Sequence, residues 1–225
     1  MSLLECLIAL ALSLVLVTPL IKSSGELIAK QIEYEKVQLL TADAERALEL
    51  IGRAIRMAGY RQAPSVALDQ GNSQSAAQYT QLQKGIGFAG SDSLIVRHEL
   101  SNGVDLDCIG NVLTKDRTQN HLALQGFFVV RQTSELARND VHGGSLMCQT
   151  YDRQGRIQNL TLMNGVQRLS IEEDLGNQRQ NLKVANASRL FTVRLEMTDG
   201  KKIQQEFGRT FATRNLRWSL HGFYP

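Results

Sequence analysis

The stretch that decides the fold is residues 1–24, MSLLECLIALALSLVLVTPLIKSS. Residues 6–21 carry no charged side chain and consist mostly of Leu, Val, Ala and Ile. About 20 apolar residues in a helix, at about 1.5 Å per residue, cross the roughly 30 Å hydrocarbon core of a membrane. The run is apolar on every face, unlike a helix of a soluble core, and it is too long for a signal-peptide core. It also has no basic region before it and no clear small-x-small cleavage site, so the sequence predicts a membrane helix.

One acidic residue, Glu5, lies in the first turn of this helix. A charged carboxylate deep in lipid is costly, and two explanations for its presence are open. Ser2 and Glu5 match the capping box S-x-x-E, which would place Glu5 near the headgroups. Alternatively, Glu5 pairs with a cation inside the membrane. Because no Lys or Arg precedes Lys22, that cation would be an α-amino group, its own or that of a neighbouring chain.

Length, net charge and Cys content limit which classes of domain and function are expected for the rest of the chain. The length of 225 residues fits an anchor followed by one medium-sized domain, and a formal charge of +3 gives no strong attraction to nucleic acid. Cys6 lies in the apolar segment, whereas Cys108 and Cys148 lie beyond it in two segments that we expect to be strands. A Cys pair in an otherwise Cys-poor domain favours a disulfide and an oxidising compartment over two unrelated thiols. By the positive-inside rule, Lys22 after the apolar segment favours a cytoplasmic C-terminus, but a single Lys is a weaker signal than the Cys pair.

A helical pattern continues beyond the apolar segment. Gly59 is expected to end it, and Pro64 prevents much continuation. Pro19 and residues 23–26 (SSGE) predict a kink or a melted turn in a helix that otherwise runs about 58 residues. We expect residues 26–60 to be an amphipathic continuation whose apolar stripe packs on the following domain. The stripe, spaced by three and four, is Val37, Leu40, Ala44, Ala47, Ile51, Ala54 and Ala58, widened by Leu48 and Ile55.

The rest of the chain predicts a loop followed by strands. Residues 61–92 are rich in Gln, Ser and Ala, which is typical of a long surface connection. Residues 93–225 show period-two alternation, with no helical pattern between the strands, so the sheet should be antiparallel with five to seven strands. Residues 198–201 (TDGK) predict a two-residue hairpin. The fold class is therefore α+β, with residues 1–25 as a membrane helix and 61–225 as a head domain. The expected strands are 94–100, 104–109, 121–132, 145–151, 156–163, 166–175 and 190–211.

Several motifs that carry chemistry elsewhere are weak here. Residues 85–90 (GIGFAG) match G-x-G-x-x-G but lack a preceding strand and a following helix, which favours a glycine turn over a dinucleotide site. Residues 102–107 (NGVDLD) lack the complete calcium-loop pattern. No G-x-S-x-G motif and no nucleophile–base pair is found, so we expect no catalytic residue, cofactor or metal. None of the four His lies at metal-ligand spacing from another His or Cys. We interpret them as surface residues: His98, His121, His142 and His221.

A basic segment near the end of the sequence raises the question of nucleic-acid binding. Residues 209–218 (RTFATRNLRW) contain Arg209, Arg214, Arg217 and the only Trp, Trp218. Arginines and an aromatic ring suit phosphate contact and base stacking. A solvated strand edge with Trp218 covering apolar surface is favoured, because the overall charge is near neutral.

The first 17 residues, MSLLECLIALALSLVLV, resemble the mature N-terminus of type IV pilins and type II secretion pseudopilins. In that class the mature chain begins with an N-methylated residue left by a prepilin peptidase, so the resemblance implies that Met1 is this residue, although Phe is usual there. It also implies that Glu5 neutralises the N-terminal amine of the adjacent subunit during filament assembly. The missing leader, which should be short, basic and end in Gly, is the second departure.

Further segments resemble minor pilins of the PilW kind, relatives of the J-type minor pseudopilin. In order they are RAIRMAGYR (53–61), SDSLIVRHE (91–99), the Cys pair, LMNGVQRLSIEEDL (162–175) and RTFATRNLRW (209–218). The resemblance implies a long helix on an antiparallel sheet, with residues 61–92 as the αβ-loop. It also implies a minor pilin that helps to initiate pilus assembly near the filament tip.

The partners that the resemblance implies are other minor pilins and the major pilin, bound through their N-terminal helices, and a possible tip adhesin. Before assembly the chain would be a single-pass inner-membrane protein with a periplasmic head, and afterwards part of an extracellular pilus. Adhesion, twitching motility and DNA uptake are activities of such pili, although we do not expect this subunit to bind DNA. The alternatives are a type II secretion minor pseudopilin and a single-pass anchored periplasmic binding module. A membrane-tethered hydrolase is disfavoured because no nucleophile–base pair is found.

Overall fold

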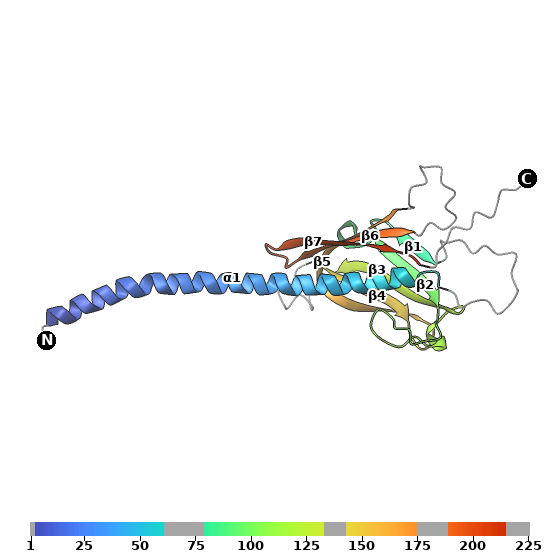
Figure 1. The fold of residues 1–225 in the computed structure, drawn as a ribbon, viewed down its shortest axis with the longest axis horizontal. Helices are drawn as coiled ribbons and strands as arrows, with labels where there is room; N and C mark the ends of the chain where they lie inside the picture. The colour runs from blue at the N-terminus through green and yellow to red at the C-terminus, as the bar shows by residue number, and fades with distance from the viewer. Residues whose placement is uncertain (1–2, 61–78, 133–142, 175–188, 215–225) are drawn as a thin grey trace, which may run out of the picture. The chain divides into compact units, whose positions relative to one another are not determined.

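One long helix and seven strands make up the computed structural model, which describes residues 3–60, 79–132, 143–174 and 189–214 (Figure 1). The strands follow one another in space in chain order, and every neighbouring pair is antiparallel. This confirms the predicted α+β class. The elements are α1 (Leu3–Met57), β1 (Thr80–Gln83), η2 (Phe88–Gly90), β2 (Ser93–Glu99), η3 (Lys115–Arg117), β3 (Leu122–Arg131), β4 (Gly144–Tyr151), β5 (Ile157–Asp174), β6 (Leu190–Thr198) and β7 (Gln204–Ala212).

The chain forms two compact units, Met1–Thr41 and Ala42–Pro225. The second unit, which we call the head, contains residues 42–57 of α1 and all seven strands. In the first unit every described residue up to position 35 is exposed, so this part of α1 contributes nothing to the core. The core of the protein is therefore the core of the head.

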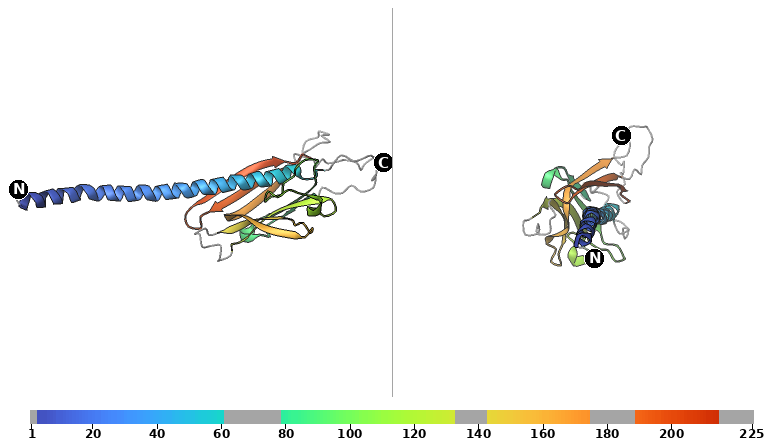
Figure 2. Two further views of the ribbon diagram at one scale, coloured as in Figure 1. Left: turned by 90° about the horizontal axis from the view of Figure 1, so that it is seen from below. Right: turned by 90° about the vertical axis from the view of Figure 1, so that its left-hand side faces the viewer.

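The apolar stripe of α1 is buried as predicted, except Val37, which is half-buried. The last part of α1 runs along the curled sheet (Figure 2). Most stripe residues within the head are Ala, and small side chains let a helix approach a sheet closely. Large buried side chains come from both the helix and the sheet, and in β6 buried residues alternate with partly exposed ones. The buried helix residues in the head are Ala44, Ala47, Leu48, Ile51, Ala54, Ile55 and Ala58, and among the largest buried sheet residues are Leu94, Phe127, Leu146, Leu169, Phe191 and Leu195.

The longest strand, β5, has an irregularity near its middle. Residues 156–163 and 166–175 were expected as two strands, but β5 runs through the Asn164–Gly165 pair. Gly165 has a φ of 79°, which suits Gly at an irregularity, and the pairing register shifts next to it. The first part of β5 pairs with β4 and the second part with β6. The NG pair is thus a bulge rather than a strand boundary.

The predicted loop 61–92 is wrong at residues 80–83, which form β1. Where the pairing of β5 with β4 ends, the residues before β2 take over as partners of β5. The Asp92 backbone N–H donates to the Leu169 carbonyl at 2.8 Å, and the Ile171 N–H donates to the Asp92 carboxylate at 2.8 Å. This carboxylate, itself buried, also accepts from Lys84 at 3.0 Å. Asp92 therefore satisfies backbone groups that the end of β4 leaves open.

The structure tests three local expectations, two in α1 and one in the hairpin between β6 and β7. The predicted melted turn at residues 23–26 is wrong, because α1 is helical throughout, with Pro19 inside the helix. The Thr18 hydroxyl donates to the Leu14 carbonyl at 2.7 Å, a side-chain bond that keeps a polar group satisfied beside the proline. The predicted end at Gly59 is confirmed: α1 stops at Met57, and Gly59 has a φ of 68°.

The predicted hairpin between β6 and β7 is confirmed, but the predicted two-residue length of its loop is wrong. Thr198 pairs with Gln204, so the loop spans residues 199–203. The Asp199 carboxylate accepts the backbone N–H groups of Lys201 at 2.9 Å and Ile203 at 2.9 Å. An Asp side chain that caps the loop in this way stabilises a longer connection.

The contact of α1 with β7 leads to a testable prediction about Gly52. A Cβ at this position would overlap the Phe211 ring, so no larger residue fits without movement. We expect Gly52→Leu to destabilise the head by roughly 1–3 kcal/mol through overpacking. Thermal unfolding of the detergent-solubilised chain measures the change.

A matched control for Gly52 is Gly208→Ala, because a Cβ at position 208 makes only ordinary contacts, with the Arg194 side chain at 3.4 Å and the Val193 carbonyl oxygen at 3.6 Å. This variant should change stability little. Combining Gly52→Leu with Phe211→Ala should cost less than the sum of the two single changes, since the Leu fills space that the ring vacates. Additive losses would show that the Phe211 ring is not what excludes a side chain at position 52.

Candidate functional site

The first candidate site is the exposed apolar part of α1. Among the described residues this is the one helix long and apolar enough to cross a membrane, and by length and composition it could be a membrane anchor or a signal sequence. No residue of its most apolar window is buried in the protein. Its two hydroxyl side chains before Lys22 are satisfied within the helix, since Ser13 donates to the Leu10 carbonyl at 2.9 Å and Thr18 to Leu14. Such internal satisfaction is what a polar group in hydrocarbon requires.

Glu5 lies in the first turn of α1, and it is the only charged residue between Leu3 and Ile21. Acids are favoured at a helix N-terminus, where the backbone N–H groups carry partial positive charge. The Ser2 half of the predicted capping box and the predicted N-methylated residue, Met1, lie outside the described residues. The structure thus places a carboxylate at the start of a helix whose following turns present apolar side chains to the surroundings.

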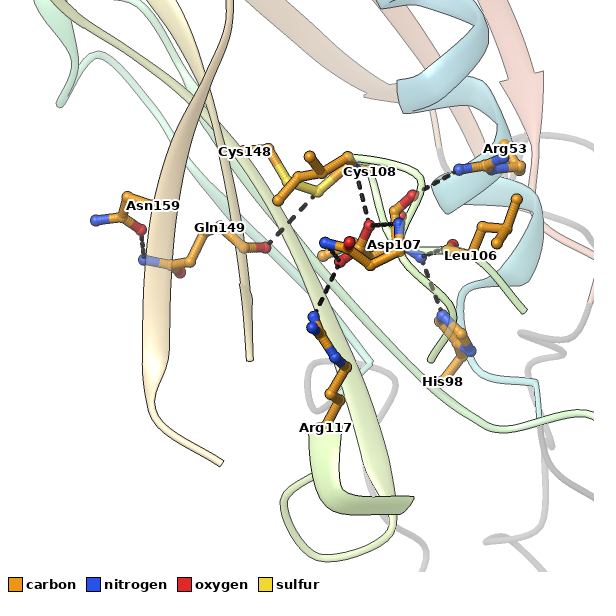
Figure 3. The surroundings of a disulfide bond; sticks show 12 residues. Arg53, His98, Leu106, Asp107, Cys108, Arg117, Cys148, Gln149 and Asn159 are labelled. Atoms are coloured by element: carbon orange, nitrogen blue, oxygen red, sulfur yellow. Dashed lines mark hydrogen bonds and ion pairs between the residues drawn. A yellow bond between two sulfur atoms is a disulfide. The ribbon is translucent and has the colours of Figure 1, made fainter. Parts of the chain in front are cut away.

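The second candidate site is the disulfide segment, which we define as residues 101–113 of the head. Cys108 is bonded to Cys148 across a sequence separation of 40, with their Cα atoms 6.2 Å apart (Figure 3). Cys148 lies on β4, as expected. The expected strand 104–109 is wrong: apart from an isolated bridge between Leu106 and Val112, this region is turn and coil, so Cys108 sits in a turn. The pairing thus fastens an irregular segment to the sheet.

Asp107 organises this segment. Its carboxylate is fully buried and accepts the backbone N–H of Ile109 at 2.9 Å and of Asn111 at 2.8 Å. The Arg117 guanidinium lies 3.6 Å away, and Arg53 of α1 donates to the Asp107 carbonyl at 2.8 Å (Figure 3). Such partners offset the cost of burying a polar carboxylate. The spacing of Asp107 and Gly110, whose φ is 96°, is typical of an Asp turn and was the sequence signal for this structure.

His98 was predicted to be a surface residue, and this is wrong: only 1% of it is exposed. The signal was present, because period-two alternation in β2 puts His98 on the same face as the buried Leu94 and Val96. Burial lowers the pKa of His98 below its usual 6.5, although the Glu99 carbonyl and the charge of Asp105 act in the opposite direction. The unfolded chain therefore binds a proton at a higher pH than the folded head does. The stability from neutral His98 is complete above about pH 6.5 and decreases as the pH falls toward the folded pKa.

The remaining sequence candidates are placed as follows. Residues 85–90 form a glycine turn around η2 that leads into β2, as expected, with Gly85 and Gly90 at φ of 66° and 73°. Arg209 forms an ion pair with Glu45 at 2.5 Å, which occupies one of the four residues considered for DNA contact. Arg214 is exposed, whereas Arg217 and Trp218 lie outside the described residues, as do His142 and His221. His121 is exposed, and within the described ranges no three His, Cys, Asp or Glu side chains gather into a metal site.

Comparison of this chain with protein-family models, curated proteins and solved structures finds no match. Any functional conclusion therefore rests on the fold and on the geometry of the candidate sites. A long apolar N-terminal helix packed on a seven-stranded antiparallel sheet is consistent with a pilin-like fold.

The disulfide leads to a prediction about stability. Reduction of Cys108–Cys148 should lower the melting temperature of the detergent-solubilised chain, because the bond restricts a 40-residue loop in the unfolded state. The expected loss is about 3–4 kcal/mol, or on the order of 10 °C. Cys6→Ser is the matched control and should show the same loss on reduction. An unchanged melting temperature, or two free head thiols found by mass spectrometry before reduction, would contradict the bond.

Proposed function

We propose that this chain is a minor pilin, a structural subunit that helps to initiate assembly of a type IV pilus and lies at or near its tip. The observation that carries the proposal is the continuity of α1, which runs without interruption from an apolar segment with one acid into the core of the head. A simple membrane anchor has no need of this continuity. A filament subunit does, because the packing of its helix must position its head.

The role of Glu5 follows from the cost of a charge in an apolar environment. The following turns expose Leu, Ile and Val on all sides, so neighbouring helices pack there through apolar contacts with little directional preference. A carboxylate among such helices is stabilised by a positive group, and a neighbouring subunit's N-terminal amine supplies one. Because the pair forms at one axial offset only, Glu5 selects the register between subunits. Maturation would leave Met1 as the N-methylated residue that brings this amine.

Other features of the head support the same cellular setting. The Cys108–Cys148 bond is typical of an oxidising compartment, as expected for a periplasmic head before assembly and an extracellular one after it. Partners would be the helices of other minor pilins and of the major pilin, with a tip adhesin as a further candidate. The head, with its seven-stranded sheet, would make lateral contacts with these neighbouring subunits.

The test is substitution of Glu5 in the chain expressed in its native host. Glu5→Leu and Glu5→Gln should each reduce recovery of the protein in sheared surface filaments by at least roughly ten-fold, because the loss of one desolvated ion pair exceeds the worth of a surface contact. The head should stay folded, as judged by its disulfide and by resistance to proteolysis. Glu26→Gln is the matched control, since Glu26 lies on the same helix beyond the apolar segment, and it should be recovered normally.

The outcomes separate the candidate functions. Normal recovery of Glu5→Leu in filaments would remove the pairing role. If the wild-type protein never enters filaments and stays in the membrane, the anchored binding module is the better description. If deletion of the gene spares surface pili but blocks export of folded periplasmic proteins, the type II secretion pseudopilin is correct. Mass spectrometry of the mature N-terminal peptide adds an independent reading, with a methylated Met1 expected.

A further inference from the structure

Three polar groups form a chain inside the head where the sheet meets the disulfide segment. His98 of β2 and Gln125 of β3 are both almost fully buried, and the Gln125 Nε2 atom lies 3.2 Å from His98 Nε2. The Gln125 Nε2 atom also donates to the Leu106 carbonyl, in the disulfide segment, at 3.4 Å. On its other side His98 Nδ1 lies 2.9 Å from the Glu99 carbonyl. One side-chain amide thus connects an imidazole of the sheet to the backbone of the disulfide segment.

The hydrogen positions in this chain follow from what each partner is able to do. A carbonyl oxygen only accepts, so His98 Nδ1 carries a hydrogen and donates it to Glu99. In the neutral imidazole the other ring nitrogen, Nε2, is then an acceptor, and it takes one hydrogen of the Gln125 amide. The second amide hydrogen is directed to Leu106. The Gln125 Oε1 atom is buried and has no hydrogen-bond partner in the described part of the chain. Neutral His98 therefore holds the amide in the orientation that bonds the disulfide segment.

We propose that His98 and Gln125 form a proton-sensitive connection that holds the disulfide segment against the sheet while His98 is neutral and releases it when His98 is protonated. A proton from solvent binds His98 Nε2, which then becomes a donor facing the amide NH₂ of Gln125, also a donor. Turning the amide by half a rotation offers Oε1 to the imidazolium and gives that oxygen a partner. The NH₂ group then faces away from Leu106, so the bond to the segment is lost.

Asp105 acts electrostatically on His98, and the charged groups labelled with His98 in Figure 3 are Arg53, Asp107 and Arg117. Asp105, in the disulfide segment, favours the imidazolium, so the segment itself promotes the protonation that loosens it. Arg53, on α1, is engaged by the Asp107 carbonyl, and the Asp107 carboxylate is bonded to backbone groups and lies near Arg117. Burial opposes protonation and holds the pKa of His98 down, so the change occurs below the pH at which a surface His titrates.

The consequence concerns an apolar surface. The disulfide segment exposes several apolar side chains, and Cys108 keeps the middle of the segment fixed to β4 in either state. Protonation of His98 therefore loosens the turn around Leu106 without detaching the segment. Acid thus changes how this surface is presented, whatever the chain assembles with, and the inference does not depend on the proposed function. The exposed apolar residues of the segment are Val104, Leu106, Ile109 and Val112.

The test is amide hydrogen exchange of the full-length chain in detergent micelles from about pH 7.5 to about pH 5, corrected for the intrinsic pH dependence of exchange. The loss of one buried hydrogen bond should reduce protection of the disulfide segment by roughly 3- to 10-fold at the lower pH. The midpoint of this change should coincide with the titration of His98 followed by NMR of its ring. The described strands β6 and β7 serve as an internal reference and should change less.

Variants separate the proposed connection from general acid weakening. Gln125→Met leaves His98 able to titrate but removes the amide, so the pH dependence of the segment should disappear. His98→Gln should remove it as well, whereas the exposed His121, changed to Asn, should leave it intact. The proposal is overturned if wild-type protection of the segment stays constant while His98 titrates. It is equally overturned if Gln125→Met retains the full pH dependence. The wild-type comparison needs no variant, so it decides the matter even if a substitution prevents folding.

Discussion

Burial of one stripe of α1 against the sheet is the interaction on which the rest of the head depends. Ala44, Ala47 and Ala54 bring the helix close to the strands, and Gly52 leaves space for the Phe211 ring alone. The stripe combines these small side chains with Leu48, Ile51 and Ile55, and the curled sheet adds large side chains such as Phe127 and Phe191 to the same core. The bulge in β5 at Gly165 and the Asp92 bonds to β5 are the local structures that permit this curl.

The same burial explains the polar groups of the head. Asp107, His98 and Gln125 lie where the irregular disulfide segment covers the sheet, and a segment without strand pairing must satisfy its backbone groups by other means. Side chains therefore replace the strand ladder: Asp107 accepts two backbone N–H groups, and Gln125 donates to a third residue's carbonyl. Such replacement brings titratable groups into the interior, and this is why a feature that stabilises the fold is also able to respond to pH.

Predictions from the sequence succeeded where a local pattern decides the structure. The stripe of α1, the stop at Gly59 and the strand alternation depend on periodicity and on glycine conformation, which act within a few residues. The failures lie where distant residues decide. The strand expected at 104–109 is a turn because Asp107 finds partners in its own segment and in Arg53, and the two strands expected around Gly165 are one because β4 and β6 pair with it in succession. The surface prediction for His98 failed for a different reason: as a residue type His is less often buried than Leu or Val, but its position follows Leu94 and Val96 in the alternation on the buried face of β2.

The sequence by itself determined an apolar helix with a single acid, its amphipathic continuation, an antiparallel sheet and a Cys pair, because chain-local chemistry specifies each of these. The tertiary structure alone decided that Cys108 sits in a turn bonded to β4, that the residues before β2 complete β5, and that Gln125 connects His98 to Leu106. These contacts join residues far apart in the chain, and their partners are chosen by which groups burial leaves unsatisfied. No periodicity in the sequence records that choice.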